Sequence, residues 1–86
     1  MGTLKSKVFS LTDSTILNVD ASWTQSLMPI GGVMHLWYGE FSGSAAELKT
    51  DGQTIPQGGL LEHIKKYTGI ISLVSASGTI KVHEVV

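Results

Sequence analysis

The fold of this chain depends on one stretch, Val33-Met34-His35-Leu36-Trp37-Tyr38-Gly39-Glu40-Phe41, which holds three of its six aromatic residues. Successive side chains of a strand point to opposite faces. One face of this strand would carry Val33, His35, Trp37 and Phe41. The other would carry Met34, Leu36 and Tyr38. A strand that is apolar on both faces belongs in a two-layer core or at an interface with another chain. We expect Val33, Trp37 and Phe41 to face the domain core and the second face to meet a neighbouring subunit.

The segments before this stretch predict two strands and a loop. Residues 7–12 and 15–23 alternate apolar and polar side chains, which is typical of half-buried strands. Residues 24–32 predict an irregular connection, because Pro29 lacks an N–H and Gly31-Gly32 is conformationally permissive. This loop is unusually apolar, so we expect part of it to cover the core edge or to face a partner.

The segments after it predict two hairpins and one helix. Asp51-Gly52, between residues 45–50 and 53–55, suits a tight hairpin turn. Residues 60–67 place apolar side chains at helical spacing. Residues 70–75 and 79–86 are rich in β-branched side chains and predict a last hairpin, with Gly78 in the left-handed conformation. We therefore expect a single domain, residues 1–86, that is mainly β with one short helix. It would be a compact small β-sandwich or a β-clip-like domain built from hairpins.

Composition restricts the classes of partner. The 86 residues are 42% hydrophobic and only 15% charged, with a net charge of −1. So few charges indicate that another protein covers part of the surface, in a homo-oligomer or a larger assembly. All six basic residues are lysines, and without arginine we expect no nucleic-acid binding. No apolar run is long enough to cross a membrane, and the absence of cysteine excludes disulfides and thiolate metal sites.

The sequence contains no recognisable catalytic motif. His35, His63 and His83 are the candidate bases or metal ligands at neutral pH, but no two share a ligand spacing. The carboxylates form no paired motif, and no serine lies in a nucleophile elbow. We expect no catalytic, cofactor-binding or metal site. Two alternatives remain open: a small ligand-binding or protein-interaction module of the cytoplasm that uses Trp23, Trp37 and Tyr38, and a metal-dependent enzyme built on the histidines.

One segment carries a family resemblance. Ile55-Pro56-Gln57-Gly58 followed by Leu60-Leu61 resembles a phrase of small β-clip domains, in which proline ends a strand and leucines re-enter the core. That group includes antifreeze-like domains and the head decoration proteins of tailed bacteriophages, which bind a protein shell as trimers.

The resemblance and the low charge together give the leading hypothesis. They imply a non-enzymatic virion protein, a bacteriophage capsid decoration or minor structural protein that acts by burial between subunits. The candidate interface residues are Leu27, Met28, Ile30, Met34, Leu36 and Tyr38.

Overall fold

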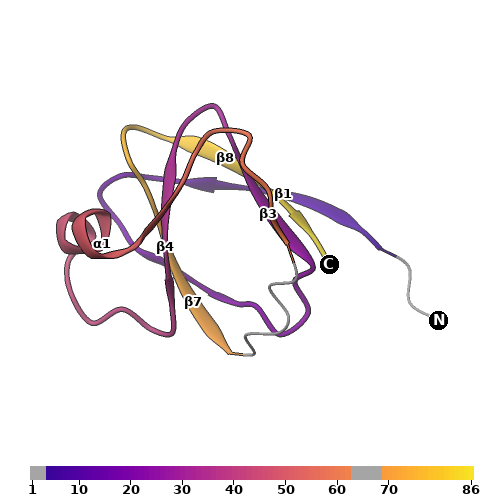
Figure 1. Ribbon diagram of the computed structural model, residues 1–86, viewed down its shortest axis with the longest axis horizontal. Coiled ribbons are helices and arrows are strands. Elements are labelled where there is room, and N and C mark those ends of the chain that lie inside the picture. Colours follow the sequence, from indigo (N-terminus) through magenta and orange to yellow (C-terminus); the bar gives the residue numbers. More distant parts are fainter. Residues whose placement is uncertain (1–3, 63–68) are drawn as a thin grey trace.

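Two antiparallel sheets form the protein, as a computed structural model describing residues 4–62 and 69–86 shows (Figure 1). The elements are β1 (Ser6–Leu11), β2 (Leu17–Asp20), β3 (Ser26–Ile30), β4 (Met34–Tyr38), α1 (Ala45–Asp51), β5 (Gln53–Ile55), β6 (Leu61–Glu62), β7 (Ile70–Ser75) and β8 (Ile80–Val85). The strand order is β1-β8-β3-β6 in sheet A and β2-β7-β4-β5 in sheet B. The predicted fold class, a mainly β sandwich with one short helix, is confirmed.

Each strand of the first half pairs with its counterpart from the second half. β1 pairs with β8, β2 with β7, β3 with β6 and β4 with β5. Two further ladders, β3 with β8 and β4 with β7, join these pairs into the two sheets. The chain is thus one antiparallel ribbon rolled around a core, which is the topology of a jelly roll. In Figure 1, β1 runs nearly horizontally and β4 nearly vertically, so the layers cross.

The predicted final hairpin is wrong in its pairing, although both of its strands exist. β7 and β8 lie in different sheets, and the chain crosses between them after Ser75. Gly78 has φ +65°, so its predicted left-handed conformation is confirmed. The apolar pattern of each strand fixes which face is buried, but it does not identify the partner strand.

The predicted hairpin at Asp51-Gly52 is also wrong, because Ala45–Asp51 is the helix α1. A capping box starts this helix. The Ser44 hydroxyl accepts a hydrogen bond from the Glu47 N–H at 3.2 Å, and the Glu47 carboxylate accepts one from the Ser44 N–H at 3.1 Å. These bonds satisfy two backbone donors at the helix start, which favours helix over the alternative strand.

Residues 26–30, predicted as a loop, form the strand β3 inside sheet A. Pro29 is tolerated there because a residue's N–H and C=O point to the same side of a strand. Its carbonyl accepts a bond from the Gly58 N–H at 2.8 Å, on the side away from β8. β6 pairs only with Ser26 and Leu27 on that side. The missing N–H therefore interrupts no ladder, as the placement of proline in sheets requires.

The predicted helix at 60–67 falls mostly outside the described part of the chain, which omits residues 63–68. In the described part of this predicted helix, Leu61 and Glu62 form the short strand β6 rather than a helical turn. This part of the helix prediction is wrong.

The two faces of β4 are exchanged relative to the prediction. Met34 and Leu36 are fully buried between the sheets, whereas Trp37 is 39% exposed on the outer side. Val33 and Phe41, expected in the core, are only partly buried. A pattern that is apolar on both faces does not reveal which face turns inward.

The core between the sheets draws on both layers. Its buried members are Leu11, Ala21, Leu27, Met34, Leu36, Ile71, Leu73, Ile80 and Val82. Val74 points the other way, since it lies opposite His35 on the outer face of sheet B, yet it too is fully buried. Helix α1 packs on β7 and β4 and buries Leu48 there. β7, rather than β4, is therefore the strand that is covered on both faces.

A buried hydroxyl joins three segments around β7. Ser72 is fully buried, and its hydroxyl donates to Asn18 Oδ1 at 2.6 Å and lies 3.2 Å from the Gly39 carbonyl oxygen. The same hydroxyl accepts a bond from the Phe41 N–H at 2.9 Å. It thereby holds β2 and the 39–41 loop against the central strand.

Replacing this hydroxyl should destabilise the protein. Ser72→Ala leaves the Phe41 N–H and Asn18 Oδ1 without this partner, which should lower the free energy of unfolding by about 1–3 kcal/mol. Urea unfolding followed by circular dichroism measures the change. Ser42→Ala, at an exposed loop position, is the control and should stay near the wild-type value. Equal stability of both variants would contradict the role of Ser72.

Candidate binding surfaces

The outer face of sheet A is apolar for a surface. Cross-strand neighbours on it form three rows: Ser10, Lys81 and Ile30; Val8, His83 and Met28; and Ser6, Val85, Ser26 and Glu62. Val8 is 61% exposed and Ile30 is 42% exposed. The outer face of an antiparallel sandwich is normally polar. In these rows the Lys, Asp or Glu side chains are Lys81 and Glu62, and the Lys81 ammonium donates to the Ser10 hydroxyl at 2.9 Å. We call these ten residues the A face.

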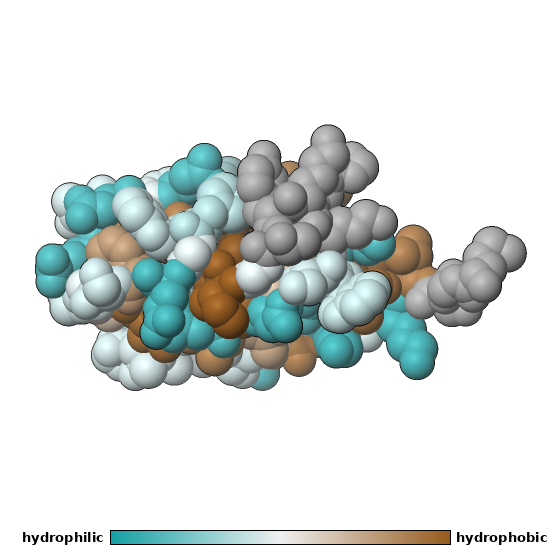
Figure 2. Space-filling view, turned by 90° about the horizontal axis from the view of Figure 1, so that it is seen from below, coloured by the Kyte–Doolittle hydropathy of each residue, from teal (hydrophilic) through white to brown (hydrophobic). Residues whose placement is uncertain are grey.

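The outer face of sheet B is different, because other parts of the chain cover it. Helix α1 lies over β7 and β4. Beside it, the Trp37 and Phe41 rings meet nearly edge-to-face, with centroids 5.2 Å apart. Figure 2, which views the molecule from below Figure 1, shows a small group of apolar side chains in the middle of the view, bordered by hydrophilic ones. Within the described residues, helix α1 covers part of the outer face of sheet B.

The six predicted interface residues divide between surface and core. Met28 and Ile30 lie on the A face, as an interface requires. Leu27, Met34 and Leu36 are fully buried between the sheets, so the prediction is wrong for them. Tyr38 is half-buried and packs against the core cluster. The segment predicted as a loop is the strand β3, whose side chains alternate between the two faces of the sheet. Leu27 therefore points into the core, and Met28 points to the outer face.

Trp23, expected on the apolar face of a half-buried strand, is the most exposed large apolar side chain of the described residues, at 79%. β2 ends at Asp20, whose carboxylate accepts bonds from the Ser22 hydroxyl at 2.7 Å and the Ser22 N–H at 3.0 Å. These two bonds hold the pKa of Asp20 below its ordinary value, and the bond from the Ser22 hydroxyl has the larger effect. They close a turn that carries Trp23 away from the sandwich. The buried Thr24 then anchors the chain by donating to Glu84 at 2.6 Å.

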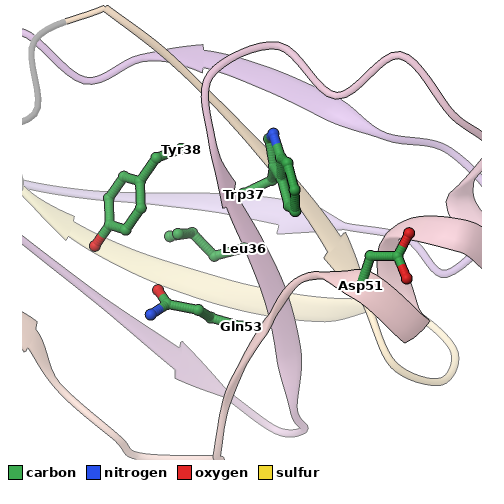
Figure 3. A pocket seen from close by; sticks show the side chains of 5 residues that line it. All are labelled: Leu36, Trp37, Tyr38, Asp51 and Gln53. Atoms are coloured by element: carbon green, nitrogen blue, oxygen red, sulfur yellow. The ribbon is translucent and has the colours of Figure 1, made fainter.

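A shallow groove lies at the edge of sheet B where β5 stops. Its volume is about 280 Å³, and it is lined by Leu36, Trp37, Tyr38, Asp51 and Gln53. β5 pairs with β4 only from Met34 to Leu36, so it leaves the next part of the β4 edge uncovered. Figure 3 shows Trp37 and Tyr38 leaving β4 on opposite sides, with Asp51 at the end of the helix. Two of the three aromatic residues predicted to form a ligand pocket line this groove, from opposite faces of β4, whereas Trp23 does not line it.

The described histidines do not form a common site. His35 lies on the outer face of sheet B, where its Nδ1 is 3.3 Å from the Thr54 hydroxyl. His83 lies on the A face, in the opposite layer, and His63 falls outside the described residues. Within residues 4–62 and 69–86, no group of three or more His, Cys, Asp or Glu side chains is placed to hold a metal ion.

The glycine pair at residues 58–59 leaves no free amide for an anion. The Gly58 N–H donates to Pro29, and the Gly59 N–H donates to the Pro56 carbonyl at 2.8 Å. Gly58 has φ +76°, which lets the chain turn after β5.

No family model, curated protein or solved structure gives a significant match to this chain. The fold places it in the architectural class of jelly-roll sandwiches. Within the described residues, no helix is long and apolar enough to span a membrane.

The environment of His35 predicts a pH dependence of stability. Desolvation first and the charge of Lys49 second lower the pKa of His35 below its ordinary value of 6.5. The unfolded chain then binds the proton more tightly than the folded one, so this residue costs stability as the pH falls below about 6.5. His35→Gln should therefore lose less stability than wild type between about pH 7.5 and 5.5.

Thermal unfolding at the two pH values measures this difference. Lys49→Gln removes the charge of Lys49 but leaves His35 desolvated. Its loss of stability between the two pH values should therefore lie between those of wild type and His35→Gln. If His35→Gln lost as much stability as wild type over this interval, the proposed titration of His35 would be wrong.

Proposed function

We propose that this chain is a non-enzymatic structural protein of a virus particle, a bacteriophage capsid decoration or minor structural protein. It acts by burying apolar surface between copies of itself on a larger protein shell. The observation that carries the proposal is the A face. There the apolar side chains of Val8, Met28 and Ile30 lie on the outer face of the sheet, where they contact water unless a partner covers them.

The occupant that best fits the A face is a second copy of the chain. The Lys, Asp or Glu side chains of this face are Lys81 and Glu62, which have opposite charges and lie in different rows, so two copies meet with little like-charge repulsion. A strongly charged partner protein would find few opposite charges to pair with on this face. Burying apolar side chains of this kind stabilises an interface by about 25 cal/mol per Å². Serines at the ends of the rows supply the polar rim that interfaces commonly have.

The fold adds support by analogy. Jelly rolls are the architecture of many viral capsid proteins, and they also occur in proteins of unrelated function. Two further features favour an assembly protein: the low share of charged residues and the exposed Trp23, a residue type that anchors interfaces.

Two matched isoleucines test the proposal. Ile30 on the A face is 42% exposed, and Ile70 on the outer face of sheet B is 41% exposed. Ile30→Lys places a charge in the proposed interface and should weaken self-association by at least about tenfold. Ile70→Lys makes the same chemical change elsewhere and should leave association unchanged.

Sedimentation velocity over a range of concentrations measures both variants and the stoichiometry, for which the β-clip resemblance implies three. Circular dichroism confirms that each variant is folded. A wild-type chain that stays monomeric throughout, or equal weakening by both substitutions, would contradict association through the A face.

A further inference from the structure

We propose that the free edge of β1 pairs with β1 of a second copy of the chain, so that sheet A continues from one copy into the other. The observation behind it is a long, exposed strand at the end of the sheet, which has a partner strand on one side alone. This contact goes beyond the A face, because its hydrogen bonds would lie in the plane of the sheet rather than above it. It does not depend on association through the A face.

β1 is the longest of the four strands that end the two sheets in the described part of the chain. It has six residues, whereas β2, β5 and β6 have four, three and two. Proteins commonly keep edge strands short or cover them, because an open edge pairs readily with another chain. Residues 4–8 and Ser10 are exposed, and Figure 1 shows the start of β1 at the right-hand side, toward the amino terminus.

The direction of the backbone groups of β1 follows from one pair of bonds. Lys5 and Val86 exchange two backbone hydrogen bonds, at 3.0 and 2.9 Å. Hydrogen-bonded pairs of this kind alternate along an antiparallel ladder, so Lys5 and every second residue after it point toward β8. The N–H and C=O groups of Ser6, Val8 and Ser10 therefore point to the open side. Among the described strands β1 pairs with β8 alone, so another strand has access to these groups.

A second β1 strand fits this edge in an antiparallel register centred on Val8. Val8 then lies opposite Val8 of the second copy, and Ser6 lies opposite Ser10. Each of these pairs exchanges two backbone hydrogen bonds. On the other face of the sheet, Lys7 lies opposite Phe9 of the second copy. Phe9 is half-buried, so its ring still offers a surface to the aliphatic stem and the ammonium group of the lysine.

The single charge of β1 selects this register. Lys7 is the one charged residue of the strand, and a lysine on an edge strand commonly prevents pairing. A shift of the register by two residues in one direction sets Lys7 opposite Lys7, where like charges repel. The opposite shift leaves Ser6 without a partner in the second β1 strand. Pairing about Val8 avoids both losses.

The resulting contact is small, because it uses one strand from each copy. Interfaces at the low end of the size range are weak, and we expect a dissociation constant of about 0.1 mM. The contact is two-fold symmetric, and it leaves the outer sides of both sheets uncovered. Combined with a separate contact through the A face, it would link more than two copies.

Two substitutions of Val8 in the full chain test the hydrogen bonds. Val8→Pro removes the N–H that points to the open side, and the ladder with β8 does not use that group. Val8→Thr keeps the N–H and the β-branched shape and is the matched control. Both variants also carry Ile30→Lys, which weakens association through the A face and leaves the β1 edge unchanged.

Sedimentation velocity at concentrations up to about 1 mM measures dimerisation, and circular dichroism confirms that each variant is folded. We expect a dimer for Ile30→Lys alone and for its combination with Val8→Thr. Val8→Pro should raise the dissociation constant at least about tenfold, because the two-fold symmetry removes two central hydrogen bonds at once.

Cross-linking tests the register separately, since the chain has no cysteine of its own. Two copies of Val8→Cys would lie opposite each other, with Cα atoms about 5.5 Å apart, and should form a disulfide under mild oxidation. Two copies of Ser6→Cys, at a position that is also exposed, would lie about 13 Å apart along the strands and should stay reduced.

Three results would overturn the proposal. The first is a chain that stays monomeric in the Ile30→Lys background. The second is equal dimerisation of Val8→Pro and Val8→Thr, and the third is equal cross-linking of the two cysteine variants. Failure of the A-face contact alone would leave the dimer of the Ile30→Lys background intact, so the two proposals are tested independently.

Discussion

The burial of β7 on both of its faces is the constraint on which the rest of the structure depends. One face packs between the sheets through Ile71 and Leu73, and the other lies under helix α1 through Val74. β2 and β4 then pair along its two edges, so sheet B is assembled around it. Apart from Ile70 at its start, every residue of this strand is buried. Its two polar side chains, Ser72 and Ser75, are accordingly hydrogen-bonded.

The rolled topology follows from pairing the two ends of the chain. β1 lies against β8, so Ser6 is opposite Val85, and the Lys5 and Val86 backbones exchange two further bonds. Nearly all ladders join segments that are distant in sequence, which makes the fold dependent on contacts formed late in folding. Only β4 and β5 are close in the chain, and α1 connects them. The helix is thus part of the connection between β4 and β5, and it packs on β7, the central strand of sheet B.

How much of the fold the sequence predicts depends on whether a feature is determined by neighbouring residues or by segments that are distant in the chain. Alternation and β-branched residues locate β1, β7 and β8 nearly as the structure has them, because these signals are local. The partners of β7 and β8 are not predictable from such patterns, since no local feature distinguishes a hairpin from a crossing between sheets. Pro29 argues against a strand, and only its edge-side carbonyl bond shows why it fits.

The helix was predictable in principle. Ser44-Ala45-Ala46-Glu47 is a capping-box sequence, and it competes with the turn signal of Asp51-Gly52. Choosing the turn places Asp51 in a hairpin instead of at the end of a helix. The groove is therefore invisible in the sequence, since it requires β4, the end of α1 and β5 to be placed correctly together.

The A face and the groove lie in different layers of the sandwich, and the topology separates them. Association through the A face would cover the outer sides of β1, β8 and β3, where Val8 and Ile30 are exposed. The groove lies in the other layer, at the edge where β5 stops. A copy held by its A face would therefore keep the groove open. Helix α1 packs on β7 and β4 and so covers part of the outer face of sheet B, where Trp37 and Ile70 stay partly exposed.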